Sequence, residues 1–156
     1  MVRKELYDAL TERITAMEGS PIAHIDLWNE QVAFLEQEDA WPLPACFIEF
    51  QPISWQPIMG GKERRGRLNL RLHLVTAYQG SSAHGSASRE ESLQHFVLVD
   101  SLMLALLDLR GILFHSVSLI ESHTNHNHEE LIETIDVYEV RCACPIEREK
   151  IDEASR

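Results

Sequence analysis

Histidine and glutamate side chains that could bind a metal gather towards the C-terminal end of the chain, at His123, His126, His128, Glu129 and Glu130. Imidazole and carboxylate groups are good ligands for zinc and similar ions. In an extended segment, His126 and His128 would project to the same side, as a chelating pair requires. The helical spacings H-E-x-x-H and E-x-x-H, which bring two such ligands together, do not occur in the sequence. The pattern therefore favours a solvated loop, with a metal site on His123, His126 and His128 as the alternative.

Catalytic signatures of other kinds are also missing from the sequence. It contains no G-x-S-x-G nucleophile motif, no phosphate-binding P-loop and no G-x-G-x-x-G motif. Asp100 lies in an apolar stretch of predicted helix, and we interpret it as a surface residue rather than a buried group satisfied across an interface. We therefore expect no catalytic residues, no cofactor and no resident metal. The alternative to this non-enzyme interpretation is a small metal-binding protein or metal-dependent enzyme that uses the three histidines.

A second group of chemically distinctive residues is cationic, although the whole chain carries a formal net charge of −11. Alternation along a predicted strand puts Arg67, Arg71 and His73 on one face. This face suits contact between copies of the chain or a solvated strand surface. Nucleic acid is the weakest of the interpretations, because net negative charge disfavours phosphate contacts and no exposed aromatic residues are interleaved. We take five residues as candidates for self-association: Arg64, Arg65, Arg67, Arg71 and His73.

Length and composition indicate an ordinary globular protein. The chain has 156 residues, of which 44% are hydrophobic and 25% charged. We expect one domain over residues 1–146 and a charged, frayed tail over residues 147–156. No apolar run is long enough for a membrane span, and the first residues lack the apolar core of a signal peptide. The three cysteines are expected to be reduced, with Cys142 and Cys144 on the inward face of the last strand.

Two helices are predicted from hydrophobic periodicity. The first runs from Val2 to Met17, where apolar residues recur at spacings of three and four, and a Gly-Ser-Pro sequence ends it. The second covers Leu93–Leu109, with Ser88 and Glu91 as a capping box before it and Gly111 as its expected C-terminal cap. This second helix is apolar nearly all round. It therefore lies either between two layers or with one face in an interface.

The remaining segments are typical of strands. Alternation of apolar and polar residues predicts strands over Ala45–Trp55 and Leu68–Tyr78, and two more over Ile112–Ser122 and Leu131–Pro145. In the last of these strands we expect a bulge or burial on both faces. The order of elements predicts an α+β fold, in which a mostly antiparallel sheet carries two main helices, the N-terminal one and Leu93–Leu109.

Three stretches of the sequence carry a resemblance to known proteins: His24–Gln31, Pro44–Phe50 and Thr124–Glu130. They look like segments of uncharacterised prophage-encoded proteins of gut bacteria. The layout of helix, long strands, loop, apolar helix and final hairpin also resembles bacteriophage tail terminator or tail-completion proteins. Those proteins are small α+β subunits that form rings, commonly hexameric, which cap the tail tube and join it to the head. The resemblance brings no catalytic residues with it, and fold by itself does not establish function.

What this resemblance implies is a structural role in virion assembly. The chain would form a tail-terminator-like ring, a homo-oligomer, at the end of the tail and would contact phage tail-tube or head-connector proteins. It would be found in the bacterial cytoplasm during assembly and in the virion tail if the prophage is functional. Neither a membrane nor a nucleic acid is an expected partner.

Overall fold

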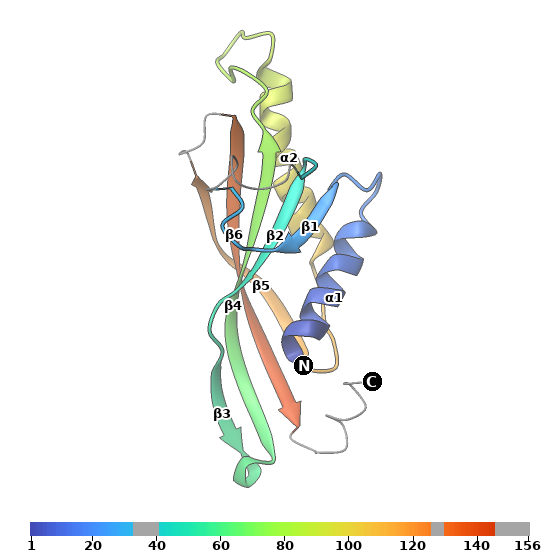
Figure 1. Cartoon of the computed structure of the whole chain (residues 1–156), viewed down its shortest axis with the longest axis vertical. Helices are drawn as coiled ribbons and strands as arrows, with labels where there is room; N and C mark the ends of the chain where they lie inside the picture. The colour runs from blue at the N-terminus through green and yellow to red at the C-terminus, as the bar shows by residue number, and fades with distance from the viewer. Residues whose placement is uncertain (33–40, 126–129, 146–156) are drawn as a thin grey trace.

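The computed structural model of the protein describes residues 1–32, 41–125 and 130–145. These residues form two layers, a six-stranded sheet and two helices that pack on one of its faces (Figure 1). The strand order is β1-β2-β4-β6-β5, with β3 also paired to β4; β1 and β2 are parallel and the other pairs are antiparallel. This arrangement confirms the predicted α+β fold. The elements are α1 (Val2–Thr15), β1 (His24–Leu27), β2 (Ala45–Phe50), β3 (Ser54–Ile58), the 3-10 turn η1 (Met59–Gly61), β4 (Glu63–Ala77), α2 (Arg89–Ala105), β5 (Phe114–Asn125) and β6 (Leu131–Pro145).

Helix α1 forms where the spacing of apolar residues predicted it. Val2, Leu6, Leu10 and Ile14 are all buried, because a four-residue spacing puts them on one side of an α-helix. That side packs into the main core together with residues of β2, β4 and β6. After α1 the chain reverses at Gly19, whose φ of 74° is a conformation that glycine adopts at little steric cost.

The single strand predicted over Ala45–Trp55 was wrong, because two strands occupy this region. Strand β2 ends at Phe50 and β3 begins at Ser54, with Pro52 between them. Proline has no N–H to donate to a sheet ladder, so it interrupts the pairing at this point. Both strands nevertheless pair with β4, β2 along its second half and β3 along its first half. The result is a β3–β4 hairpin that extends beyond both helices (Figure 1).

Helix α2 begins directly after Ser88, as predicted, but its first turn is not capped as expected and its C-terminal end comes earlier. The capping box does not form, since Ser88 makes no side-chain cap and its hydroxyl instead donates to the carbonyl oxygen of Ser81 (2.9 Å). The helix also ends at Ala105 rather than near Gly111. The guanidinium of Arg13 in α1 donates to the carbonyl oxygens of Ala105 (3.0 Å) and Leu107 (3.1 Å). A side chain from α1 therefore satisfies carbonyl groups at this helix end that a glycine cap was expected to satisfy.

Strands β4 and β6 form the centre of the sheet and are paired over their whole lengths. Tyr138 and Val140 of β6 are buried on the helix side, whereas Glu133 and Val137 are buried on the opposite side. The predicted burial of the last strand on both faces is thus confirmed. The register shifts lie in its partner β5, on either side of the segment from Ser116 to Leu119.

The sheet buries two separate cores. The main core lies between the sheet and the helices. A smaller one covers part of the helix-free face and consists of Val32, Ala45, Phe47, Val75 and Leu131, against which Trp28, Trp41 and Leu43 pack. The helix-free face is therefore divided into a covered part, beside β1, and a part that the arginines of β4 and β6 occupy.

No helix in the described part of the chain is long and apolar enough to cross a membrane.

Candidate functional site

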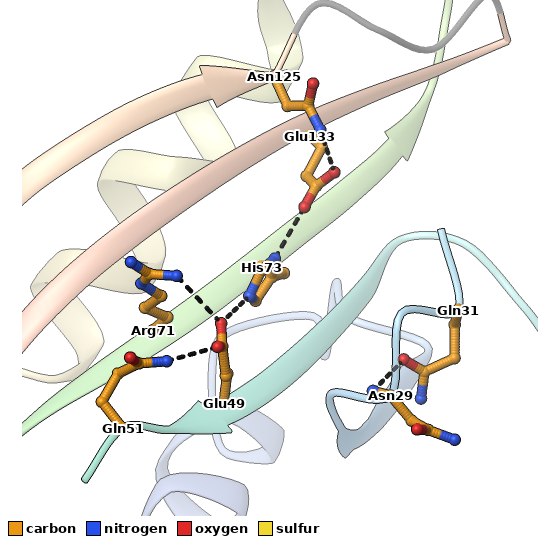
Figure 2. A network of polar contacts seen from close by, with 8 residues as sticks. All are labelled: Asn29, Gln31, Glu49, Gln51, Arg71, His73, Asn125 and Glu133. Atoms are coloured by element: carbon orange, nitrogen blue, oxygen red, sulfur yellow. Dashed lines mark hydrogen bonds and ion pairs between the residues drawn. The ribbon is translucent and has the colours of Figure 1, made fainter. Parts of the chain in front are cut away.

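A buried charge network lies on the helix-free face, where His73 of β4 sits between two carboxylates (Figure 2). Its Nδ1 is 2.7 Å from Oε1 of Glu133 in β6, and its Nε2 is 2.8 Å from Oε2 of Glu49 in β2. His73 is 3% exposed and Glu133 only 1%. Both ring nitrogens of His73 are therefore within hydrogen-bond distance of a carboxyl group, so the buried imidazole bridges Glu49 and Glu133.

Neighbouring side chains complete the network around these three groups. Arg71 Nη1 lies 3.7 Å from Glu49 Oε2, and the amide of Gln51 donates to the other oxygen of the same carboxylate (Figure 2). Asn125 Nδ2 of β5 donates to Glu133 Oε2 (3.0 Å). The network therefore joins β2, β4, β6 and β5, and it places His73 and Arg71 beside the carboxyl groups of Glu49 and Glu133.

The covering of this network comes from the segment after β1. The ring of Trp28 stacks on the imidazole of His73, with the ring centroids 3.9 Å apart and the planes at 4°. Gln31 holds the turn that carries Trp28, because its Nε2 donates to the carbonyl oxygen of Leu27 (2.8 Å) and its Oε1 accepts from the backbone N–H of Asn29 (2.6 Å). Since both ring nitrogens of His73 are engaged and its face is covered, the residue ties strands together rather than presenting a free base.

Of the arginines that the sequence grouped with His73, Arg65, Arg67 and Arg71 lie on the same face of the sheet as His73 and are exposed. We call Arg65, Arg67, Arg71 and Arg141 the arginine face; their side chains are 67%, 64%, 44% and 58% exposed. Arg64 has the opposite parity, and its guanidinium lies over the ring of Trp55 at 5.1 Å. His73 is thus buried, whereas the four arginines of the arginine face are exposed, and Arg71 also contacts Glu49 of the buried network.

Carboxylates beside the arginine face are less exposed than the arginines. Nε of Arg65 is 3.5 Å from Glu63, and the Nε atoms of Arg67 and Arg141 are each 3.4 Å from Glu139. Solvent-exposed ion pairs of this kind contribute at most about 1 kcal/mol to stability, so the guanidinium groups can exchange them for other contacts. An open groove of about 710 Å³ runs between these side chains, with Trp55 and His115 also in its lining.

The helix layer presents a different surface. One side of α2 is buried through Ser92, His95 and Leu102, whereas four apolar side chains on the rest of the helix and the turn after it are 45–59% exposed: Phe96, Val97, Leu104 and Leu107. Helix α2 therefore does not lie between two layers, and the other expected arrangement, with one face in an interface, stays a prediction. A groove of about 630 Å³ lies between this helix and the end of α1, and its lining includes Met17, Glu18, Pro21, Val97 and Leu104.

The histidine cluster is only partly within the described residues. His123 is exposed, and its Nε2 lies 3.0 Å from Oε1 of Glu121. His126, His128 and Glu129 lie outside the described residues, as do residues 147–156. Across residues 1–32, 41–125 and 130–145, no three His, Cys, Asp or Glu side chains are placed so as to hold a metal ion. The expectation about metal binding at these histidines therefore stays a prediction.

Sequence reasoning missed several buried polar residues. His95 of α2 lies between Oγ1 of Thr76 (2.8 Å) and Oγ1 of Thr134 (2.7 Å), and burial lowers the pKa of its imidazole. Asp136 accepts a hydrogen bond from the hydroxyl of Ser122 (2.6 Å), and burial raises the pKa of its carboxyl. In the sequence, both residues lie in segments that are otherwise largely apolar. This position could have indicated buried polar groups, which must find hydrogen-bond partners inside the protein.

Comparison with known proteins defines the fold. No protein-family model matches the chain, and no curated protein does so either. A solved chain described as part of the "Virion of native gene transfer agent (GTA) particle" has a similar structure, with a TM-score of 0.52 and 12% sequence identity. The match covers 92% of this chain and 98% of that one. At this identity the similarity establishes a common fold, which here extends over nearly the whole of both chains.

Proposed function

We propose that the protein is a structural subunit of a phage-like virion, which forms a ring at the end of the tail and contacts tail-tube or head-connector proteins. The observation that carries this proposal is the whole-chain fold similarity to a chain of a gene transfer agent virion. The resemblance of the sequence to prophage-encoded and tail-completion proteins supports it. Its place would be the bacterial cytoplasm during assembly and then the tail of the particle, and its role would not be enzymatic.

Two surface features also support an assembly role. The chain exposes apolar side chains on α2 and four arginines on the opposite side of the sheet. Apolar patches and arginines are typical of protein–protein contact, because both gain from desolvation against a complementary surface. Contact between two different surfaces of identical subunits produces a ring when the rotation between subunits closes.

The proposal is tested by measuring the mass of the full chain in solution by light scattering over a range of concentrations, alone and with tail-tube subunits. We expect assembly to a closed oligomer of definite mass as concentration rises, or on the addition of tail-tube protein. A chain that stays monomeric at high concentration and does not associate with tail-tube or head-connector proteins would contradict the proposal.

A further inference from the structure

The two exposed surfaces lie on opposite sides of one sheet. Along β4, Leu68 and Leu70 pack into the core beneath the helices, while Arg67 and Arg71 alternate with them and are exposed. The helices cover the first side (Figure 1). A copy of the protein therefore presents the helix layer on one side of the sheet and the arginine face on the other. One neighbour cannot cover both surfaces of the same copy.

The helix layer carries carboxylates among its exposed apolar side chains. On α2, Asp100 is three residues from Val97 and four from Leu104, a spacing that puts the three side chains on one side of the helix. All three are exposed, and Glu18 lines the neighbouring groove between α1 and α2. Exposed carboxylates therefore lie among and beside the apolar side chains of this surface.

The chemistry of arginine fits such a mixed surface. A guanidinium is planar and weakly hydrated, so it can lie against apolar side chains while its N–H groups donate to carboxylates. An arginine side chain is also long enough to exchange a weak ion pair within its own chain for a contact with another copy. In the arginine face, the nitrogen–oxygen distances of these ion pairs with glutamates are 3.4–3.7 Å. Contacts between opposite charges would further offset the repulsion between two copies that each carry a formal net charge of −11.

We propose that the arginine face of one copy contacts the helix layer of the next copy, around Val97, Asp100 and Leu104. This inference rests on the proposed function, because it assigns the contact between subunits of the proposed ring. Each copy would use one face towards each neighbour, which is the head-to-tail arrangement that closes into a ring. The apolar side chains supply the buried area, and the charge pairs set orientation and register.

The test uses light scattering on the full-length chain and on two variants with reversed charge, Arg67→Glu and Asp100→Arg. Each is expected to raise the concentration at half-assembly about tenfold, because it places like charges across the contact. The two changes combined in one chain are expected to recover most of the wild-type assembly, since the opposite charges then face each other again. Arg3→Glu, an exposed change at the far end of α1 with the same change in charge as Arg67→Glu, is the matched control and should assemble as the wild type does.

The outcomes separate this inference from the proposed function. If the wild type assembles and neither reversal weakens it, the assignment of faces is overturned while the ring stands. If the wild type neither assembles nor binds tail-tube protein, the proposed function itself fails. If Arg67→Glu assembles normally but loses affinity for a labelled DNA duplex, the arginine face binds nucleic acid and the inference is overturned. Should Arg67→Glu not fold by circular dichroism, Asp100→Arg decides, because it changes an exposed helical residue.

Discussion

The buried network predicts that replacing His73 destabilises the protein strongly. In His73→Leu, the carboxylate of Glu133, only 1% exposed, loses a partner at 2.7 Å and keeps the amide of Asn125 at 3.0 Å. Glu49 is more exposed, at 22% of its side chain, and keeps Arg71. Removing one partner of a buried ion pair costs about 3–5 kcal/mol. Because both carboxylates keep other contacts, we expect the low end, a loss of about 3 kcal/mol in the free energy of unfolding.

Urea denaturation at pH 7, followed by far-UV circular dichroism, measures this loss. The protein concentration is kept low, so that subunit association does not add to the stability. His123→Leu is the matched control, because His123 also lies close to a glutamate, at 3.0 Å, but the two side chains are 49% and 59% exposed. An exposed pair of this kind contributes little, and we expect the control to change the free energy of unfolding by less than about 0.5 kcal/mol.

A double variant, His73→Leu with Glu133→Leu, tests the cause of the loss. If the cost arises from taking one partner away from a buried carboxylate, removing that carboxylate recovers part of the lost free energy, and the two changes are not additive. The reasoning is refuted if His73→Leu costs no more than the His123→Leu control. It is also refuted if the double variant loses the full sum of the two single losses.

Three further predictions concern titration, thiols and metal. Cys142 and Cys144 should react slowly with a thiol reagent at pH 8, because burial raises the pKa of both thiols, that of Cys142 to about 11; rapid labelling of both in the native protein would contradict this. Because burial raises the pKa of Asp136, ionising this carboxyl group destabilises the wild-type protein as pH rises. The Asp136→Asn variant does not ionise at this position, so its free energy of unfolding should increase relative to that of the wild type between about pH 4 and pH 7. A relative decrease would contradict the assignment. Replacing His126 and His128 together by Ala should change the free energy of unfolding by less than about 0.5 kcal/mol, and stoichiometric zinc in wild-type protein purified without added metal would instead favour the metal-binding alternative.

Local periodicity was enough to predict the elements that depend on one buried side. Helix α1 follows from a four-residue spacing of apolar residues, and the part of β4 from Leu68 to Leu74 follows from strict alternation. Strand β4 nevertheless begins at Glu63, before the predicted strand. In both cases the information is local, since the helical or extended backbone alone decides which side chains share a face. The inward parity of Cys142 and Cys144 was predicted on the same basis, and both thiols are free and buried.

Contacts between distant parts of the chain decided the rest. Arg13, 92 residues away in sequence, donates to a carbonyl group at the end of α2, a contact that the local sequence around Ala105 does not reveal. His73 has the same parity as the exposed arginines, and alternation alone could not distinguish it from them. Its burial depends on Trp28 from the segment after β1 and on Glu133, 60 residues along the chain. Periodicity determines which side chains share a face, whereas only tertiary packing determines which part of that face is covered.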